Sequence, residues 1–179
     1  MNGITKRNEH VTFENIICET EQDHNNKKAC VEFVDNMPHC KNMFFTGLPG
    51  CGKTMMASAI INELESKRQT GAIRTVRQIV RQFDLARDFN SSVSESGVLS
   101  SLVNVDLLVI DEIALGKGND QEKFILHDIL DGRYGEMKPT ILISNETSKG
   151  IANNIGDRLV SRMKSDLTQL KFTGKDKRL

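Results

Sequence analysis

The sequence contains no tryptophan and only one tyrosine among its 179 residues. Aromatic side chains form the platforms on which proteins stack nucleic-acid bases, so base stacking is not expected to dominate any contact with DNA or RNA. We expect Phe83 and Phe89 to lie in the core rather than on a binding surface.

The chain also lacks an excess of charge of either sign, because its 24 Lys and Arg residues balance 24 Asp and Glu residues. No net charge therefore marks the whole protein as a binder of nucleic acid or of membranes, and any DNA contact must be local. Residues 1–35 are rich in acidic side chains and residues 158–179 in basic ones. The basic end is either a phosphate-facing surface or a solvated tail.

Paired cysteines and long apolar runs are absent as well. The four cysteines form no C-x-x-C pair, which argues against a zinc ribbon and against a redox dithiol. No apolar run reaches the length of a membrane-spanning helix, and the N-terminus lacks the apolar core of a signal peptide. We expect a single-domain cytoplasmic protein with reduced thiols.

Short apolar runs alternate with longer stretches of mixed character. The runs predict strands, and they lie at residues 42–46, 72–76, 107–110 and 140–144. Apolar residues at helical spacing predict helices over residues 54–67, 77–89 and 122–134, and the serine-rich stretch 90–97 predicts a loop. Strands that alternate with helices predict an α/β fold with a parallel sheet covered on both faces.

Residues 47–54, GLPGCGKT, match the phosphate-loop motif G-x-x-x-x-G-K-[ST] between a predicted strand and a predicted helix. Glycines let backbone N–H groups turn toward phosphate oxygens, and the N-terminus of the following helix favours negative charge. Lys53 is expected to contact the β and γ phosphates, and Thr54 to bind Mg²⁺. The predicted nucleotide-binding residues are Gly47, Pro49, Gly50, Cys51, Gly52, Lys53, Thr54 and Met55.

Two carboxylates follow a second apolar run, in LLVIDE at residues 107–112. The carboxyl ends of parallel strands meet at one edge of a sheet, so both groups are expected beside the phosphate loop. We assign Asp111 to Mg²⁺ and Glu112 to the attacking water, as its orienting group or base. Asn145, which ends another predicted strand, is expected to hydrogen-bond the γ-phosphate or that water.

Pairs of arginines at helical spacing suggest two further sites. Arg158 and Arg162 lie four residues apart, so they form either a solvated helical face or an arginine finger that completes the site of a neighbouring subunit. Arg77 and Arg81 repeat this spacing, with Arg87 nearby, next to the serine-rich loop. We expect these three to contact the backbone of single-stranded DNA without reading its sequence.

With these residues in place, the chain resembles the AAA+ ATPase core of the DnaC-type replicative helicase loaders and of their transposition relatives, the IstB-type helper ATPases. The resemblance runs from TFEN at residues 12–15, which looks like the family's approach to the nucleotide pocket, to GKDKR at residues 174–178. Its most specific pieces are NVDLLVIDE at 104–112, RY at 133–134, KPTI at 138–141, SN at 144–145 and GDRLVSRM at 156–163.

The resemblance implies a P-loop NTPase with ATP and Mg²⁺ as cofactors. It also implies an arginine that acts in trans, for which Arg162 is the first choice and Arg158 the second, and a sensor-like arginine matched best by Arg178. A helical insertion near residues 77–97 is expected to contact single-stranded DNA. A phage or mobile-element origin is favoured, although the residues do not separate it from a chromosomal one.

The sequence differs from the family pattern near its N-terminus and near its C-terminus. Family loaders carry a separate domain that grips the helicase, whereas here only about ten residues precede Val11, so the expected organisation is an extension at 1–10 and an AAA+ domain at 11–179. The helicase contact is expected either in the acidic segment 14–35 or on a partner protein. No helical lid is expected after Arg178.

Several functions remain open at this point. The leading hypothesis is an ATPase that assembles head to tail and helps load a hexameric replicative helicase onto single-stranded DNA. The alternatives are a transposition helper that acts on duplex DNA, an ATP-dependent adaptor or competitor of a host helicase loader, and a small-molecule kinase. Glu112 argues against the adaptor, and no acceptor pocket or mobile lid is apparent for a kinase.

Overall fold

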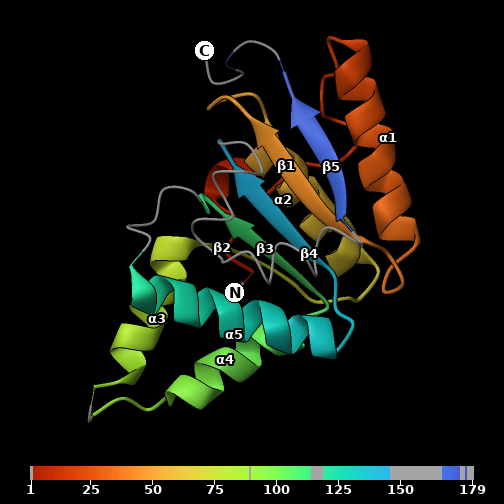
Figure 1. The fold of residues 1–179 in the computed structure, drawn as a ribbon. Coiled ribbons are helices and arrows are strands. Elements are labelled where there is room, and N and C mark those ends of the chain that lie inside the picture. The colour runs from red at the N-terminus through yellow and green to blue at the C-terminus, as the bar shows by residue number, and fades with distance from the viewer. Residues whose placement is uncertain (1, 89, 114–118, 146–166, 174–175, 177–179) are drawn as a thin grey trace.

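The computed structural model describes residues 2–88, 90–113, 119–145, 167–173 and 176. Its centre is a parallel sheet of five strands in the order β2-β3-β4-β1-β5 (Figure 1). This confirms the predicted α/β class. The strands are β1 (Asn42–Gly47), β2 (Gly71–Thr75), β3 (Leu107–Asp111), β4 (Thr140–Ser144) and β5 (Leu167–Phe172).

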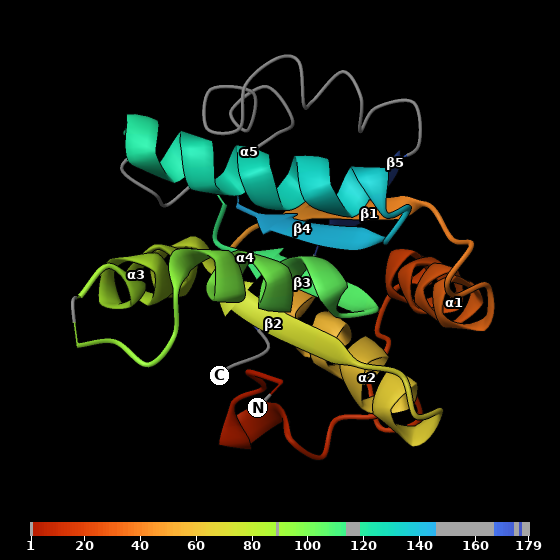
Figure 2. The same ribbon diagram turned by 90° about the horizontal axis from the view of Figure 1, so that it is seen from below.

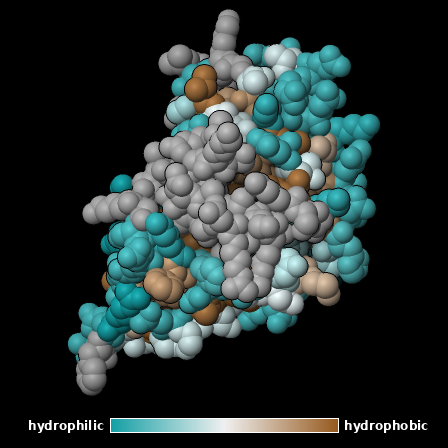
Figure 3. All heavy atoms as spheres, viewed as in Figure 1, coloured by the Kyte–Doolittle hydropathy of each residue, from teal (hydrophilic) through white to brown (hydrophobic). Residues whose placement is uncertain are grey.

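Helices cover both faces of the sheet (Figure 2). On one face lie α1 (Glu21–Asp35) and α2 (Lys53–Ser66), and on the other lie α3 (Val76–Ala86), α4 (Glu95–Asn104) and α5 (Asp120–Gly135). A short 3₁₀ helix, η1 (Lys6–Asn8), precedes them and contacts α2. Figure 3 shows hydrophilic side chains over the outer surface of α1.

The two hydrophobic cores follow from the alternation of side chains along each strand. Phe45 and Ile143 point into the core beneath α1 and α2, and their neighbours Phe44 and Leu142 point into the core beneath α3, α4 and α5. Strands that are buried on both faces read as continuous apolar runs, which is why β1, β3 and β4 were predictable from sequence.

Besides η1, three elements were not predicted. Helix α1 buries polar as well as apolar side chains, among them Asp23 and Asn26, so its sequence shows no clean apolar stripe. Helix α4 starts inside the stretch predicted as a loop, because Ser94 caps it by accepting a hydrogen bond from the Gly97 N–H at 3.1 Å. Strand β5 has a mixed pattern, with Leu170 and Phe172 buried.

The order of the strands places three functional segments side by side. β1, β4 and β3 are consecutive neighbours, and Thr46 at the end of β1 pairs with Ser144 at the end of β4. The phosphate loop, Asn145, Asp111 at the end of β3 and Glu112 just after it therefore meet at the carboxyl edge of the sheet, as predicted. Within the described residues, no helix is long and apolar enough to cross a membrane.

Candidate nucleotide-binding site

A pocket of about 310 Å³ opens at this edge of the sheet. One wall is the phosphate loop with the start of α2, the floor is formed by the ends of β3 and β4, and a further wall comes from the N-terminal segment. The lining residues are Thr5, Arg7, Asn8, Pro49, Gly50, Gly52, Lys53, Thr54, Met55, Asp111, Glu112, Ser144 and Asn145.

The glycines of the phosphate loop are required by its backbone. Gly50 and Gly52 have φ angles of +82° and +95°, which residues with a Cβ atom adopt only at a cost. Gly47 has a φ of +149° and is required by packing as well, since a Cβ atom there would lie 2.0 Å from the Phe172 carbonyl oxygen of β5. Gly47 and the buried Cys51 thus belong to the loop but do not line the pocket.

Lys53 is buried at the first position of α2, where its ammonium group folds back onto the loop. The Nζ atom donates hydrogen bonds to the Gly47 and Leu48 carbonyl oxygens at 2.7 and 2.8 Å, and to Cys51 Sγ at 3.6 Å. The loop carbonyl oxygens therefore hold the ammonium group beside the pocket, and none of these three acceptors is a carboxylate. A phosphate oxygen is a stronger acceptor than a carbonyl oxygen, so the ammonium can exchange one for the other.

Thr54 and Asp111 are joined directly across the pocket floor. The Thr54 hydroxyl donates to Asp111 Oδ2 at 2.7 Å, and the Glu112 N–H donates to Asp111 Oδ1 at 2.7 Å. Asp111 is buried, whereas Glu112 is exposed to the pocket and has a φ of +57°. The turn at Glu112 directs the chain away from the strand, so the two carboxylates occupy different environments although they are adjacent in sequence.

The end of β4 completes the pocket floor. Ser144 is buried, and Asn145, the first residue after the strand, is exposed on the pocket wall. The pocket thus brings together Lys53, Thr54, Asp111, Glu112 and Asn145, which sequence reasoning placed in one site.

The wall from the N-terminal segment was not predicted. It consists of Thr5, Arg7 and Asn8 from η1 and the residue before it. Residues 12–15, which resemble the family's approach to the pocket, instead form a turn in which Thr12 and Asn15 exchange side-chain and backbone hydrogen bonds at 2.9 and 3.3 Å. The sequence indicates this wall only through the position of residues 5–8, a few residues before that motif.

Three predicted residues lie outside the described part of the chain. These are Arg158 and Arg162, the candidates for a trans-acting arginine, and Arg178, the candidate sensor. Phe89 is outside it as well, whereas Phe83 is buried in the core as predicted.

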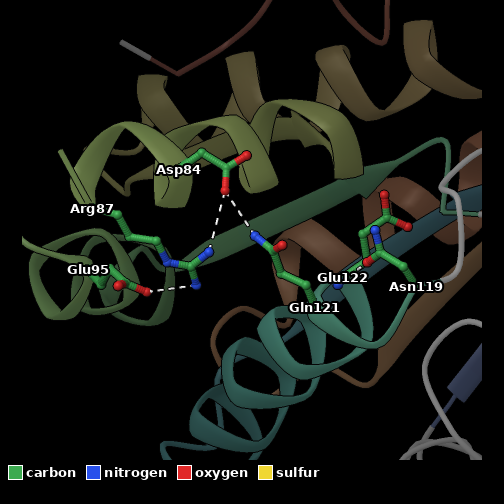
Figure 4. A network of polar contacts seen from close by, with 6 residues as sticks. All are labelled: Asp84, Arg87, Glu95, Asn119, Gln121 and Glu122. Carbon is green, nitrogen blue, oxygen red and sulfur yellow. Dashed lines mark hydrogen bonds and ion pairs between the residues drawn. The ribbon is translucent and has the colours of Figure 1, made fainter.

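The predicted DNA-contacting arginines are separate from the pocket. Arg77 and Arg81 are exposed along α3, and neither makes an ion pair with another described residue. Arg87 differs, because its guanidinium donates to Glu95 at 3.1 Å and to Asp84 at 3.4 Å (Figure 4). Asp84 also accepts a hydrogen bond from Gln121 of α5 at 2.9 Å, so this cluster links α3, α4 and α5.

Comparison with known proteins places this arrangement in a family. The sequence profile described as IstB-like ATP binding protein matches residues 4–167. The replicative helicase loader DnaC of Escherichia coli (strain K12) is 34% identical over 164 residues, which cover 90% of this chain and 66% of that protein. The chain therefore spans slightly less than two thirds of this relative's length.

Solved structures share the fold. A crystal structure of the DnaC helicase loader matches with a TM-score of 0.83 at 21% identity and covers 94% of this chain and 100% of that one. AMPPCP-bound DnaA from Aquifex aeolicus matches with a TM-score of 0.79 at 22% identity and covers 94% and 52%. These similarities show that the chain shares the α/β fold of these proteins.

The phosphate loop, the adjacent carboxylates and the parallel sheet are thus accompanied by a profile match over most of the sequence. The chain belongs to the family of IstB-like ATP binding proteins.

Proposed function

We propose that this chain is an ATPase that binds ATP with Mg²⁺ and helps load a hexameric replicative helicase onto single-stranded DNA. The observation that carries the proposal is the convergence of Lys53, the Thr54–Asp111 pair and Glu112 on one pocket. The client is proposed from the relative named a replicative helicase loader.

Phosphate binding is assigned to the loop and Lys53. Backbone N–H groups of the loop and of the α2 N-terminus approach the phosphates, since Gly50 and Gly52 carry no side chain that would block them. Lys53 gives up its hydrogen bonds to the Gly47 and Leu48 carbonyl oxygens and transfers them to phosphate oxygens. The cation is already desolvated by burial, which lowers the cost of this exchange.

The oxygen atoms of Thr54 and Asp111 fit Mg²⁺, which prefers carboxylate and hydroxyl oxygens together with water and substrate phosphates. The direct 2.7 Å bond between them places both oxygens at one point of the pocket. When bound, Mg²⁺ would neutralise phosphate charge and support the departure of the leaving group.

Glu112 is assigned to the attacking water. Its exposure on the pocket wall lets its carboxylate accept a proton or a hydrogen bond from that water, while the buried Asp111 stays engaged with Thr54. Asn145 supplies an amide on the same floor, for the water or for the γ-phosphate. Arg162 or Arg158 of a neighbouring subunit, assembled head to tail, would complete the site.

The first experiment measures ATP turnover against protein concentration, alone, with single-stranded DNA and with duplex DNA. A rate that rises more steeply than concentration, and rises again with single strands, supports intersubunit sites and the loader. Glu112→Gln should keep ATP binding and lower turnover by at least about tenfold. Glu136→Gln, which removes an exposed carboxylate at the end of α5, is the matched control and should leave both unchanged.

Equal turnover in Glu112→Gln and in the unmodified chain would overturn the role of Glu112. A turnover near zero under all conditions, with ATP still bound, would instead favour an adaptor in which ATP serves assembly. Loading itself is read from the amount of helicase retained on single-stranded DNA with and without this chain.

A transposition helper is the second candidate, because the matching family profile carries the IstB name. It shares the pocket and the chemistry and differs in the DNA that it engages. Stimulation by duplex DNA rather than by single strands in the same experiment would favour it.

A further inference from the structure

The wall of the pocket formed by residues 5–8 is too short to hold its own position. η1 has three residues, none of them buried, and its turn is closed by a hydrogen bond from the Asn8 N–H to the Thr5 carbonyl oxygen at 2.8 Å. Isolated single turns of helix are unstable in water, because fixing the first turn costs more than one hydrogen bond returns. Contacts with the rest of the molecule must therefore set where Thr5, Arg7 and Asn8 lie.

One asparagine of α2 supplies several of those contacts. The Asn62 side-chain amide donates to the Val11 carbonyl oxygen at 2.8 Å and lies 3.3 Å from each of the Asn8 and Glu9 carbonyl oxygens. Three carbonyl oxygens of the N-terminal segment thus surround a single amide group. An aspartate of the same shape offers no donor for these oxygens.

A second contact lies one turn closer to the phosphate loop. The Asn8 side-chain amide donates to the Ser58 hydroxyl at 3.2 Å, and this hydroxyl donates to the Thr54 carbonyl oxygen at 2.8 Å. Ser58 is buried, so water has little access to its hydroxyl. We call the contacts made by Ser58 and Asn62 the α2 latch.

The latch residues are in line with the phosphate site. Thr54, Ser58 and Asn62 are spaced four residues apart, so they lie along one face of α2 over its first three turns. The first turn carries the hydroxyl that pairs with Asp111, and the next two turns carry the latch. A rigid helix therefore fixes the separation between the phosphate end of the pocket and the wall at residues 5–8.

We propose that Asn62, supported by Ser58, is a positioning residue for nucleotide binding, which holds the wall at residues 5–8 against the part of the nucleotide beyond its phosphates. The inference rests on the ATP-binding part of the proposed function and on no assumption about helicase or DNA. The phosphates are held by the loop, by Lys53 and by Thr54, none of which contacts Asn62 through these bonds. Losing the latch should then weaken binding of the nucleoside part alone.

The test compares ATP with inorganic triphosphate, which shares its phosphates and lacks its nucleoside. Dissociation constants of both, with Mg²⁺, are measured by calorimetry for the full chain and for Asn62→Ala and Asn62→Asp. We expect both variants to bind ATP about tenfold more weakly and to bind triphosphate within about twofold of the unmodified chain. Ser58→Ala should show a smaller change in the same direction. Because it keeps the Asn62 bonds, it serves as the test variant if the Asn62 variants fail to fold.

Asn25→Ala, at an exposed asparagine of α1, is the control and should change neither constant. Unchanged ATP affinity in the Asn62 variants, or in Ser58→Ala where they do not fold, overturns the inference. An equal loss for ATP and triphosphate also overturns it, since that result describes general damage to the fold. If the unmodified chain binds neither ligand, the proposed function itself is wrong.

Discussion

Arg133 is the largest fully buried side chain in the described part of the protein, although it is an arginine. Its guanidinium donates six hydrogen bonds, five to the carbonyl oxygens of Leu102, Val103, Val105, Asp106 and Pro139 and one to the Thr140 hydroxyl. Burial lowers its pKa to about 10, partly offset by the charge of Asp106. The group therefore stays charged at neutral pH and ties the end of α4 to the starts of β3 and β4.

Replacing Arg133 tests this arrangement. Arg133→Met should lower the free energy of unfolding by about 3–5 kcal/mol, because it leaves buried carbonyl oxygens without donors. Arg133→Lys keeps the charge but has fewer donors, so its free energy of unfolding should lie between those of the unmodified chain and Arg133→Met. Urea unfolding at neutral pH measures both, and a loss below about 1 kcal/mol for the methionine variant would show that water replaces the bonds.

At the scale of elements, the arginines of α3 and of its C-terminal end differ in whether they form ion pairs. Arg77 and Arg81 are exposed on α3, whereas Arg87 at its end is already paired with Asp84 and Glu95 (Figure 4). A phosphate that binds Arg87 must compete with two carboxylates, so Arg77 and Arg81 are the stronger candidates for a DNA contact.

Arg77→Ala combined with Arg81→Ala should weaken binding to single-stranded DNA. Each lost phosphate contact is expected to reduce the slope of log K against log salt by about 0.7, so the slope should fall by roughly 1.4. Lys27→Ala with Lys28→Ala removes the same charge from α1 and is the matched control. The DNA-contact assignment is wrong if both double variants bind single-stranded DNA with the same affinity. Arg87→Ala alone should lose less of this affinity than the double variant of α3.

At the scale of the whole molecule, the nucleotide site depends on segments far apart in sequence. Residues 5–8, the phosphate loop and the ends of β3 and β4 all line the same pocket. A ligand there binds the folded state and not the unfolded chain, so it should stabilise the entire domain.

ATP with Mg²⁺ at about one hundred times its dissociation constant should add about 2.7 kcal/mol, which corresponds to a rise in Tm of roughly 5–10 °C. Chelating Mg²⁺ should reduce the shift, because Thr54 and Asp111 then lose the ion that links them to the phosphates. Lys53→Ala should abolish it. Thermal denaturation measures all three, and a full shift in Lys53→Ala would argue that the ligand binds elsewhere.

The sequence by itself determined four strands of the parallel sheet, the phosphate loop and the two carboxylates at the end of β3. These features are local: a strand buried on both faces is a continuous apolar run, and a loop that cradles phosphate needs glycine where φ is positive. Neighbouring carboxyl ends of parallel strands then bring Asp111, Glu112 and Asn145 to Lys53 and Thr54.

Only the tertiary structure decided α1, α4, the wall at residues 5–8, the latch at Asn62 and the burial of Arg133. Except at the start of α4, which Ser94 caps locally, polar side chains there are satisfied by partners distant in sequence, such as Asn62 with the Val11 carbonyl oxygen or Arg133 with that of Leu102. Hydropathy patterns register where apolar surface is buried, but they carry no signal for a buried polar group whose hydrogen-bond partners are set by the fold.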